Sequence, residues 1–174
     1  MLTDKHPARS CGTCGMCCKL HVIEELNKPR NKWCVNAAVG TGCKIYDARP
    51  SPCRAFNCEW LVNPQLGDAW KPDRSKFYIS RDGDVLNVLV DLAAPNAWRG
   101  PEYYPTLKRV ASELVLQNQL MIVIIGERRI VVLPDRDEDL GNIGNKHVIQ
   151  LGKRPVQGQI EYLVQVVPAD QSPN

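Results

Sequence analysis

Residues 11–18 read Cys11-Gly-Thr-Cys14-Gly-Met-Cys17-Cys18, and this run governs how the first third of the chain is organised. Two cysteines separated by two residues converge on one ion, because the backbone folds back between them. Gly12 and Gly15 suit such tight turns, which often need a positive φ or a close backbone approach. Cys17 and Cys18 are neighbours with diverging side chains, so the sequence predicts two metal sites or a bridging thiolate.

The chain has 174 residues and eight cysteines, all of which lie between residues 11 and 58. Eight thiolates are enough for two closed tetrahedral sites with four sulfur ligands each. The predicted metal ligands are Cys11, Cys14, Cys17, Cys18, Cys34, Cys43, Cys53 and Cys58. Thiolate coordination suits both Zn²⁺ and iron–sulfur clusters. We favour Zn²⁺, because one four-iron cluster would use only four of the eight thiolates.

A disulfide framework is the alternative use of eight cysteines. We expect a cytoplasmic protein, because residues 1–10 are polar and no apolar signal segment precedes Cys11. Reducing cytosol opposes stable disulfides, and a disulfide between Cys17 and Cys18 would close a strained ring. Metal ligation is therefore the favoured interpretation.

Two further classes of protein fit the composition poorly. The longest apolar run, residues 120–125, is far shorter than the roughly 18 residues that a membrane-spanning helix needs. The formal net charge of +3 is too small for the strongly basic face of a typical nucleic-acid binder. We therefore expect neither a membrane nor a nucleic-acid partner.

The composition changes once along the chain. We predict a cysteine-cluster metal-binding module over residues 1–72, an α+β module over residues 73–168 and a flexible tail over residues 169–174. The first module has no long periodic segment and needs a staple in place of an apolar core. Ordering each residue costs about 1.5 kcal/mol of conformational entropy. One structural zinc contributes about 10–16 kcal/mol of binding free energy, which counts toward folding.

The second module shows ordinary helix and strand patterns. Leu107, Val110, Ala111 and Leu114 have helical spacing, with Pro105 suited to the first turn. Strands are predicted over residues 76–80, 85–91, 120–125, 129–133, 147–151 and 160–166, with hairpin turns at 81–84 and 126–127. The acidic residues 135–139 are interpreted as a solvated loop. The fold class is therefore α+β: an irregular metal-stapled N-terminal cysteine module packed on a small antiparallel sheet with one main helix.

Several residues beside the cysteines are candidates for tuning the metal centre. Arg49 and Arg54 bracket Cys53 with positive charge, which would damp the charge of the thiolates. Tyr46 is an aromatic residue that could keep water away from the centre, as could Phe56 and Trp60, although plain packing explains these three equally well. His21 is a weaker ligand candidate, because enough cysteines are present without it.

Two blocks resemble the YkgJ-type cysteine-cluster family. They are Cys-x2-Cys-x2-Cys-Cys at residues 11–18 and Tyr46-x2-Arg49-Pro50-x2-Cys53-Arg54. The match covers about residues 10–60. The resemblance implies a zinc- or iron-chelating domain whose metal centre is formed by the eight cysteines, and it implies no particular reaction. Flagellin lysine methylases look like distant relatives, but nothing in residues 76–174 supports methyl transfer.

The leading functional hypothesis is a metal-binding protein whose cysteine cluster is a structural centre that supports interaction with a protein partner. A closed thiolate shell leaves no position for substrate, and the chain contains no P-loop, dinucleotide-binding or nucleophile-elbow motif. No catalytic residue is therefore named. The alternatives are an iron–sulfur enzyme or electron carrier, including a protein-modifying enzyme, and a metal store or carrier.

Overall fold

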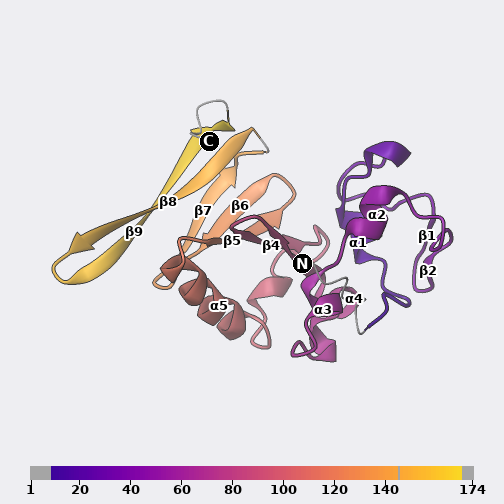
Figure 1. The fold of residues 1–174 in the computed structure, drawn as a ribbon, viewed down its shortest axis with the longest axis horizontal. Coiled ribbons are helices and arrows are strands. Elements are labelled where there is room, and N and C mark those ends of the chain that lie inside the picture. Colours follow the sequence, from indigo (N-terminus) through magenta and orange to yellow (C-terminus); the bar gives the residue numbers. More distant parts are fainter. Residues whose placement is uncertain (1–8, 145, 170–174) are drawn as a thin grey trace, which may run out of the picture. The chain divides into compact units, whose positions relative to one another are not determined.

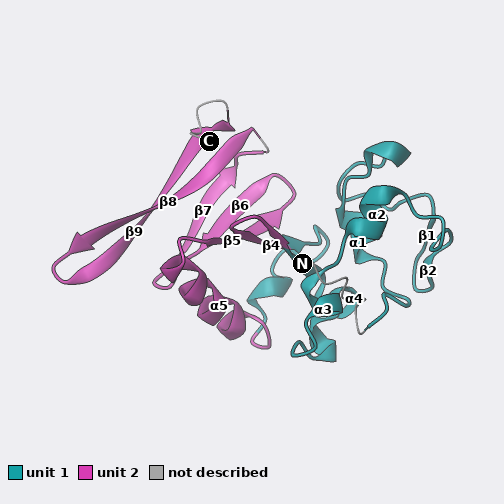
Figure 2. Cartoon of the chain, in the orientation of Figure 1, with its two compact units in different colours: residues 1–80, 89–100 teal, residues 81–88, 101–174 magenta. Residues whose placement is uncertain are grey.

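The computed structural model describes residues 9–144 and 146–169 (Figure 1). It confirms the predicted mixed α+β class, with several small sheets and few helices. The chain divides into two compact units, coloured separately in Figure 2. Unit 1 comprises Met1–Ser80 and Leu89–Gly100, and unit 2 comprises Arg81–Val88 and Pro101–Asn174. The polar start of the chain (residues 1–8) and most of the predicted tail (residues 170–174) lie outside the described residues.

Unit 1 is built from short elements joined by turns. Its described α-helices have four or five residues, and prolines stand at the starts of two of them. The elements are α1 (Met16–Leu20), η1 (Glu24–Leu26), β1 (Ala37–Ala38), β2 (Gly42–Cys43), α2 (Ser51–Ala55), α3 (Glu59–Val62), η2 (Asp68–Trp70), α4 (Pro72–Ser75) and η3 (Ala97–Arg99). Helices this short do not persist on their own propensity, so tertiary contacts must hold them.

The cysteine-bearing segment of unit 1 has little apolar core. Among the described residues between 11 and 58, only three large apolar side chains are buried: Met16, Leu20 and Ile23. Most of the buried apolar surface of unit 1 comes from later residues, including Trp60, Leu61, Phe77, Tyr78 and Trp98. The segment that carries all eight cysteines is therefore the part of unit 1 least supported by hydrophobic burial.

Five strands form the main sheet, in the order β3-β4-β5-β6-β7. They are β3 (Phe77–Asp82), β4 (Val85–Val90), β5 (Leu120–Ile125), β6 (Arg128–Val132) and β7 (Asp137–Asn142). The pairs β5–β6 and β6–β7 are antiparallel. Gly83 and Gly126 take positive φ values of 54° and 61° in the two hairpin turns. The first four strands and both turns agree with the prediction, which rested on short apolar segments separated by turn formers.

The predicted main helix is α5 (Tyr104–Leu116), with a proline in its first turn. Its buried residues are Leu107, Ala111, Leu114 and Val115, which recur every three or four positions and so share one face. Val115 packs in one core cluster with Ile122 of β5 and Val131 of β6. The helical spacing in the sequence thus identified the face that packs on the sheet of unit 2.

Strand β7 contradicts part of the predicted solvated loop over residues 135–139: residues 137–139 are in the strand, whereas residues 135–136 lie outside it. The carboxylate of Asp137 is only 8% exposed and accepts a hydrogen bond from the Tyr104 hydroxyl at 2.9 Å. Lys108 Nζ lies 3.3 Å from the same carboxylate. Arg128 of β6 forms an ion pair with Asp139 across the strand pair. Cations on neighbouring elements neutralise the acidic run, which allows it to pair with β6 as an edge strand.

Strands β8 (His147–Val156) and β9 (Gln159–Pro168) form a separate two-stranded antiparallel sheet. Both strands were predicted, and both are longer than predicted. They follow one continuous register from the pair Val156 and Gln159 to the pair His147 and Pro168. Ile149, Leu151, Tyr162 and Val164 near their middle pack against the core cluster of unit 2. Figure 1 shows this hairpin in yellow and orange as a long ribbon.

Candidate metal centre

The turn at the start of the cysteine segment has the expected tight geometry. The Cys14 amide donates to the Cys11 carbonyl at 2.9 Å, and Gly12 between them has a φ of 55°. Gly15 serves differently: a methyl group there would lie 3.2 Å from the Trp33 ring. Gly12 is therefore required for its left-handed backbone, and Gly15 for a close approach.

A second set of backbone contacts connects the cysteines near the middle of the segment. Cys34 donates its amide to the carbonyl of Cys18 at 2.9 Å, and Ala37 donates to the carbonyl of Cys34 at 3.0 Å. Ala37 of β1 then pairs with Cys43 of β2. Three cysteines up to 25 positions apart are thus connected by main-chain hydrogen bonds and one strand pair.

Gly42 brings these two parts of the segment against each other. Its φ is 117°, which is accessible to glycine and strained for other residues. A methyl group at Gly42 would lie 2.7 Å from the carbonyl oxygen of Gly12. The turn between Cys11 and Cys14 and the strand that carries Cys43 are therefore in direct backbone contact.

We expect Gly42→Ala to destabilise unit 1 and to lower its metal content. The backbone conformation alone costs about 1–3 kcal/mol, and the clash with Gly12 adds to it. Gly40→Ala is the matched control, since Gly40 has a φ of 81° with open space around its Cα. Denaturant unfolding and metal analysis of both purified variants test this. Equal losses in the two variants would contradict the close-approach argument.

The last two cysteines lie on short helices. Cys53 is inside α2, which follows Pro50 and carries Pro52 in its first turn. Cys58 immediately precedes α3, and the nearby backbone N–H groups of Leu61 and Trp60 favour its thiolate form. Proline fixes φ before the chain folds, so the approach to Cys53 loses less entropy on ordering.

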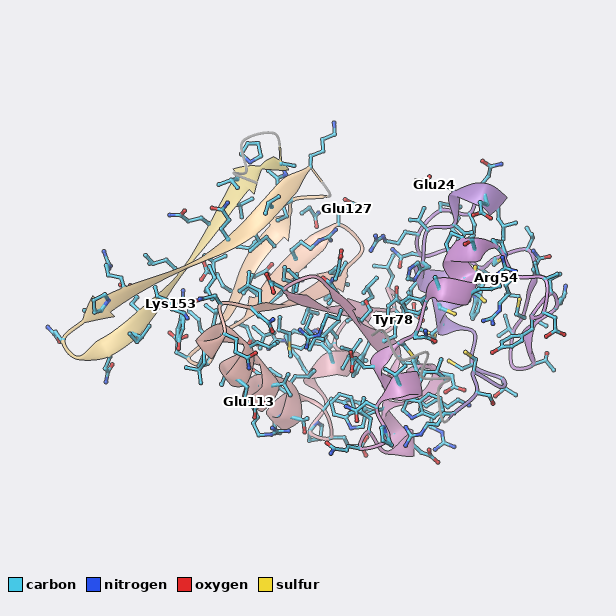
Figure 3. All side chains as sticks on the ribbon, in the orientation of Figure 1. Glu24, Arg54, Tyr78, Glu113, Glu127 and Lys153 are labelled. Atoms are coloured by element: carbon cyan, nitrogen blue, oxygen red, sulfur yellow. The ribbon has the colours of Figure 1, made fainter. Side chains whose placement is uncertain are left out.

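All eight cysteines lie in the described part of the chain, and all are free thiols. Together they line two cavities within unit 1. The first, of about 50 Å³, is lined by Cys11, Cys14, Cys17, Cys18, Cys34, Cys43 and Cys53. The second, of about 40 Å³, is lined by Cys11, Cys14, Cys17, Cys53 and Cys58. Figure 3 shows sulfur atoms gathered near α1 and α2, by the labelled Arg54.

The thiols surround these cavities without closing on one point. In residues 9–144 and 146–169, no group of three or more His, Cys, Asp or Glu side chains is arranged to hold a metal ion. A tetrahedral zinc–thiolate site has Zn–S distances of about 2.3 Å and so needs its four sulfurs in mutual contact. The donor chemistry fits zinc and iron–sulfur centres alike, and binding a single ion would require the thiols to move closer.

The thiols of Cys17 and Cys18 are hydrogen-bonded to each other. The hydrogen bond from the Cys17 thiol to the Cys18 sulfur raises the pKa of Cys17 far above its usual value, and burial adds to that effect. The same bond lowers the pKa of Cys18 to about 7, against the opposing effect of burial. The charges of Lys28 and Arg49 also favour the Cys18 thiolate. Cys18 is therefore the thiol best prepared to bind a cation at neutral pH.

Burial holds three other thiols in the neutral form. It raises the pKa of Cys58 to about 11, and it also raises the pKa values of Cys14 and Cys53. Neighbouring thiols contribute to each of these shifts, because a second thiolate nearby disfavours the first. A metal that binds here must release protons, so its affinity will increase with pH.

Lys28 is a buried cation that the sequence analysis missed. Its side chain is almost inaccessible, and its Nζ donates to the carbonyls of Lys19 (2.8 Å) and His21. Its charge interacts with the thiols of Cys34, Cys18 and Cys17, while burial lowers its own pKa. Nothing in the cysteine spacing marks Lys28. It faces the cluster because its backbone forms a β-bridge with Ile23.

The predicted flanking cations have different positions. Arg49 lines both cavities, stacks 3.7 Å above the Tyr46 ring and donates to the Tyr46 carbonyl at 2.8 Å. Arg54 is exposed and lines neither cavity. A further cation beside the cysteines, Lys19, forms an ion pair with Asp91 at 2.7 Å. Arg49, held by Tyr46, is therefore the flanking arginine whose charge reaches the thiols.

Aromatic side chains form part of the cavity walls. Tyr46 lines the first cavity, Trp60 lines the second, and Phe56 lines both. The rings of His21 and Phe56 lie 4.3 Å apart, and Phe56 and Tyr78 lie 5.1 Å apart. Tyr78, which the sequence analysis did not single out, also lines the second cavity.

His21 is held as a neutral side chain in this aromatic group. Its Nδ1 is hydrogen-bonded to the Tyr78 hydroxyl at 2.7 Å. Burial, followed by the charges of Arg30 and Lys28, lowers the pKa of His21 to about 4. Burial also raises the pKa of Tyr78, so the hydroxyl stays protonated. The hydrogen bond to Tyr78 occupies Nδ1 of the ring.

We expect the His21 ring to titrate near pH 4 in the folded protein and near 6.5 in denaturant, as ring-proton NMR would measure. The unfolded chain binds this proton at a higher pH than the folded protein does. The free energy of unfolding is therefore highest above about pH 6.5, where the ring is neutral in both states, and it falls by about 3 kcal/mol as the pH decreases toward 4. His21→Gln assigns the resonance. A folded-state midpoint near 6.5 would mean that the ring is solvated.

Comparison with known proteins returned no match. No family model, no curated protein and no solved structure is detectably similar to this chain. The resemblance of residues 10–60 to the YkgJ-type family therefore stays a prediction. In the described residues, the helices are too short or too polar to cross a bilayer.

Proposed function

We propose that this chain is a metal-binding protein whose eight cysteines hold zinc or iron as a structural centre of unit 1. One observation carries the proposal: eight free thiols from separate stretches of residues 11–58 line two cavities of one unit. Thiolates are soft ligands that select zinc, copper(I) and iron–sulfur clusters. Metal ligation would account for the gathering of every cysteine of the chain in this segment.

The weak apolar core of this segment supports a structural role. Three buried apolar side chains across residues 11–58 supply on the order of 5–9 kcal/mol, at about 1.5–3 kcal/mol each. One structural zinc contributes about 10–16 kcal/mol, which is more than this burial supplies. A metal bound by the thiols would therefore be the larger stabilising contribution in this segment.

The surrounding charges also favour thiolate ligands. Lys28 and Arg49 are the cations that act on Cys18, and Lys28 also acts on Cys34 and Cys17. Four thiolates around one Zn²⁺ carry a formal charge of −2, which neighbouring cations stabilise. When bound, the metal would cross-link the chain. The thiols would release their protons to bind it, with Lys28 and Arg49 favouring the thiolates, and the aromatic side chains of the cavity walls would exclude water.

Metal analysis of protein purified under air and under anaerobic conditions tests the proposal. We expect zinc or iron bound in stoichiometric amounts, and two zinc ions per chain if each site holds four sulfurs. A folded, fully reduced protein without metal in both preparations would disprove it. Quantifying acid-labile sulfide in the same samples distinguishes zinc from an iron–sulfur cluster.

An iron–sulfur centre is the second candidate, favoured by the space between the thiols. The first cavity, of about 50 Å³, is several times the roughly 10–15 Å³ that a single water-sized sphere requires. Thiols around such a space suit a polynuclear cluster as well as separate ions. Visible absorption and electron paramagnetic resonance of anaerobic protein test it. A colourless, sulfide-free protein that retains zinc would exclude it.

The proposed partner of unit 1 is another protein. Five large apolar side chains in its cysteine segment are exposed: Val22, Trp33, Val35, Val39 and Tyr46. Val35 and Val39, at 80% and 68% exposure, flank β1 in the loops that the metal would hold. Contiguous exposed apolar side chains mark interaction surfaces, and these two are only four residues apart in the sequence.

A further inference from the structure

The way the eight thiols contact one another divides them into two groups. The division matters because two four-sulfur sites and one eight-sulfur centre predict different chemistry. Its starting point is α1, where Cys17 and Cys18 are consecutive. Successive residues of a helix point about 100° apart. The two thiols are hydrogen-bonded to each other, yet beyond that bond each has different cysteine neighbours.

Cys18 belongs with the cysteines of the middle segment. Its carbonyl accepts the Cys34 amide, and Cys34 is connected through Ala37 to Cys43. The fourth member is Cys53, whose thiol interacts electrostatically with those of Cys18, Cys34 and Cys43. All four line the first cavity, and three of them, Cys18, Cys34 and Cys43, do not line the second.

Cys17 belongs with the turn at the start of the segment. Besides Cys18, its thiol interacts with those of Cys11 and Cys14. Cys58 interacts with the same two thiols, and it lines only the second cavity. Cys17 and Cys58 also share a neighbour, because the Tyr78 hydroxyl interacts with both. Cys53 lines both cavities, but its interacting thiols are those of the first group.

We infer that the proposed metal centre consists of two four-thiol sites: site A with Cys11, Cys14, Cys17 and Cys58, and site B with Cys18, Cys34, Cys43 and Cys53. This inference rests on the proposed function. Each site takes its ligands from distant parts of the segment, so a metal bound there would close a long loop. Site A joins residues 11–17 to α3, and site B joins α1 to β2 and α2. In the metal-free protein, the hydrogen bond between the thiols of Cys17 and Cys18 connects the two groups.

The two sites differ in their surroundings. Lys28 and Arg49 both act on Cys18 of site B, and Lys28 also acts on Cys34. Site A instead has Asp73, whose charge raises the pKa of Cys14, and the buried hydroxyl of Tyr78. A cation-rich site stabilises thiolates better than an acid-flanked one.

Cadmium-113 correlation NMR of the wild-type protein tests the grouping directly. With two bound cadmium ions, we expect one to correlate with the Hβ protons of site A and the other with those of site B. Correlations that mix the two groups on one ion would overturn the inference. Absence of any bound zinc, iron or cadmium would overturn the proposed function instead.

Metal content of serine variants gives a second readout. Cys58→Ser and Cys43→Ser are each expected to lose one of two metal equivalents, and the double variant to lose both. Cys34→Ser combined with Cys43→Ser is the matched control, expected to keep one, because both changes fall in site B. Val35→Ala, beside Cys34, should keep both. If either single variant loses all its metal while unit 2 stays protected from amide exchange, the sites are not separate.

Discussion

Removing the metal with a chelator will unfold the cysteine segment of unit 1 and leave the core of unit 2 folded. The expected loss is large, because a structural zinc contributes about 10–16 kcal/mol and residues 11–58 bury only three large apolar side chains. Hydrogen exchange measured by mass spectrometry on the full chain checks this. Amides of α1, β1 and β2 should exchange much faster after chelation.

The second unit provides the internal control for this experiment. Strands β5 and β6 and helix α5 share a core of fully buried residues that contains none of the thiols. Their amides should keep their protection in the same chelated sample. If the metal leaves while α1 and β1 stay protected, the cluster stores or carries metal, and the structural proposal is wrong.

Replacing Lys28 with methionine will destabilise the metal-loaded protein by about 3 kcal/mol. Two partly buried carbonyls, those of Lys19 and His21, lose a charged donor, and each such bond contributes about 1.5–3 kcal/mol. Methionine keeps much of the apolar stem, so the loss reports the charge and the hydrogen bonds. The metal should also be lost at lower chelator concentration, since Lys28 acts on three thiols.

Lys32→Met is the matched control for that variant. Lys32 is also in the cysteine segment but is exposed, so its replacement should change stability by less than about 0.5 kcal/mol. Denaturant unfolding and chelator competition on both variants measure the difference. Metal-free protein provides a second comparison. It has fewer thiolates to stabilise the buried Lys28 charge, so Lys28→Met should lower the free energy of unfolding by less there than in the metal-loaded protein. Equal costs with and without metal would mean that the lysine acts only through its hydrogen bonds.

Much of unit 2 could be predicted from residue periodicity. The helix with Leu107 and Leu114 on one face agrees with the structure, as do the short apolar strands that flank the turns at Gly83 and Gly126. Strand β7 could not be found in this way, since its acidic residues carry no apolar pattern. Its pairing depends on Lys108, which is distant in sequence.

For the candidate site, the spacing of the cysteines predicted a set of metal ligands but not which of them are neighbours. All eight of these cysteines line the two cavities. The repeat at residues 11–18 indicated a tight turn, and Gly12 adopts it. Lys28 and Tyr78 carry no motif, and they reach the thiols through a β-bridge and a strand. A buried lysine is visible only when its hydrogen-bond partners are known.

The amino-acid order alone established the chemistry of this protein: a soft, sulfur-rich donor set gathered in one poorly hydrophobic segment, followed by an amphipathic helix and strands. The folded chain was needed to assign each thiol to its neighbours, to separate Arg49 from Arg54, and to put a buried cation among the sulfurs. The reason is that composition and periodicity are local properties of the chain. Contacts between residues 18 and 34, or 11 and 58, depend on how distant backbone segments meet.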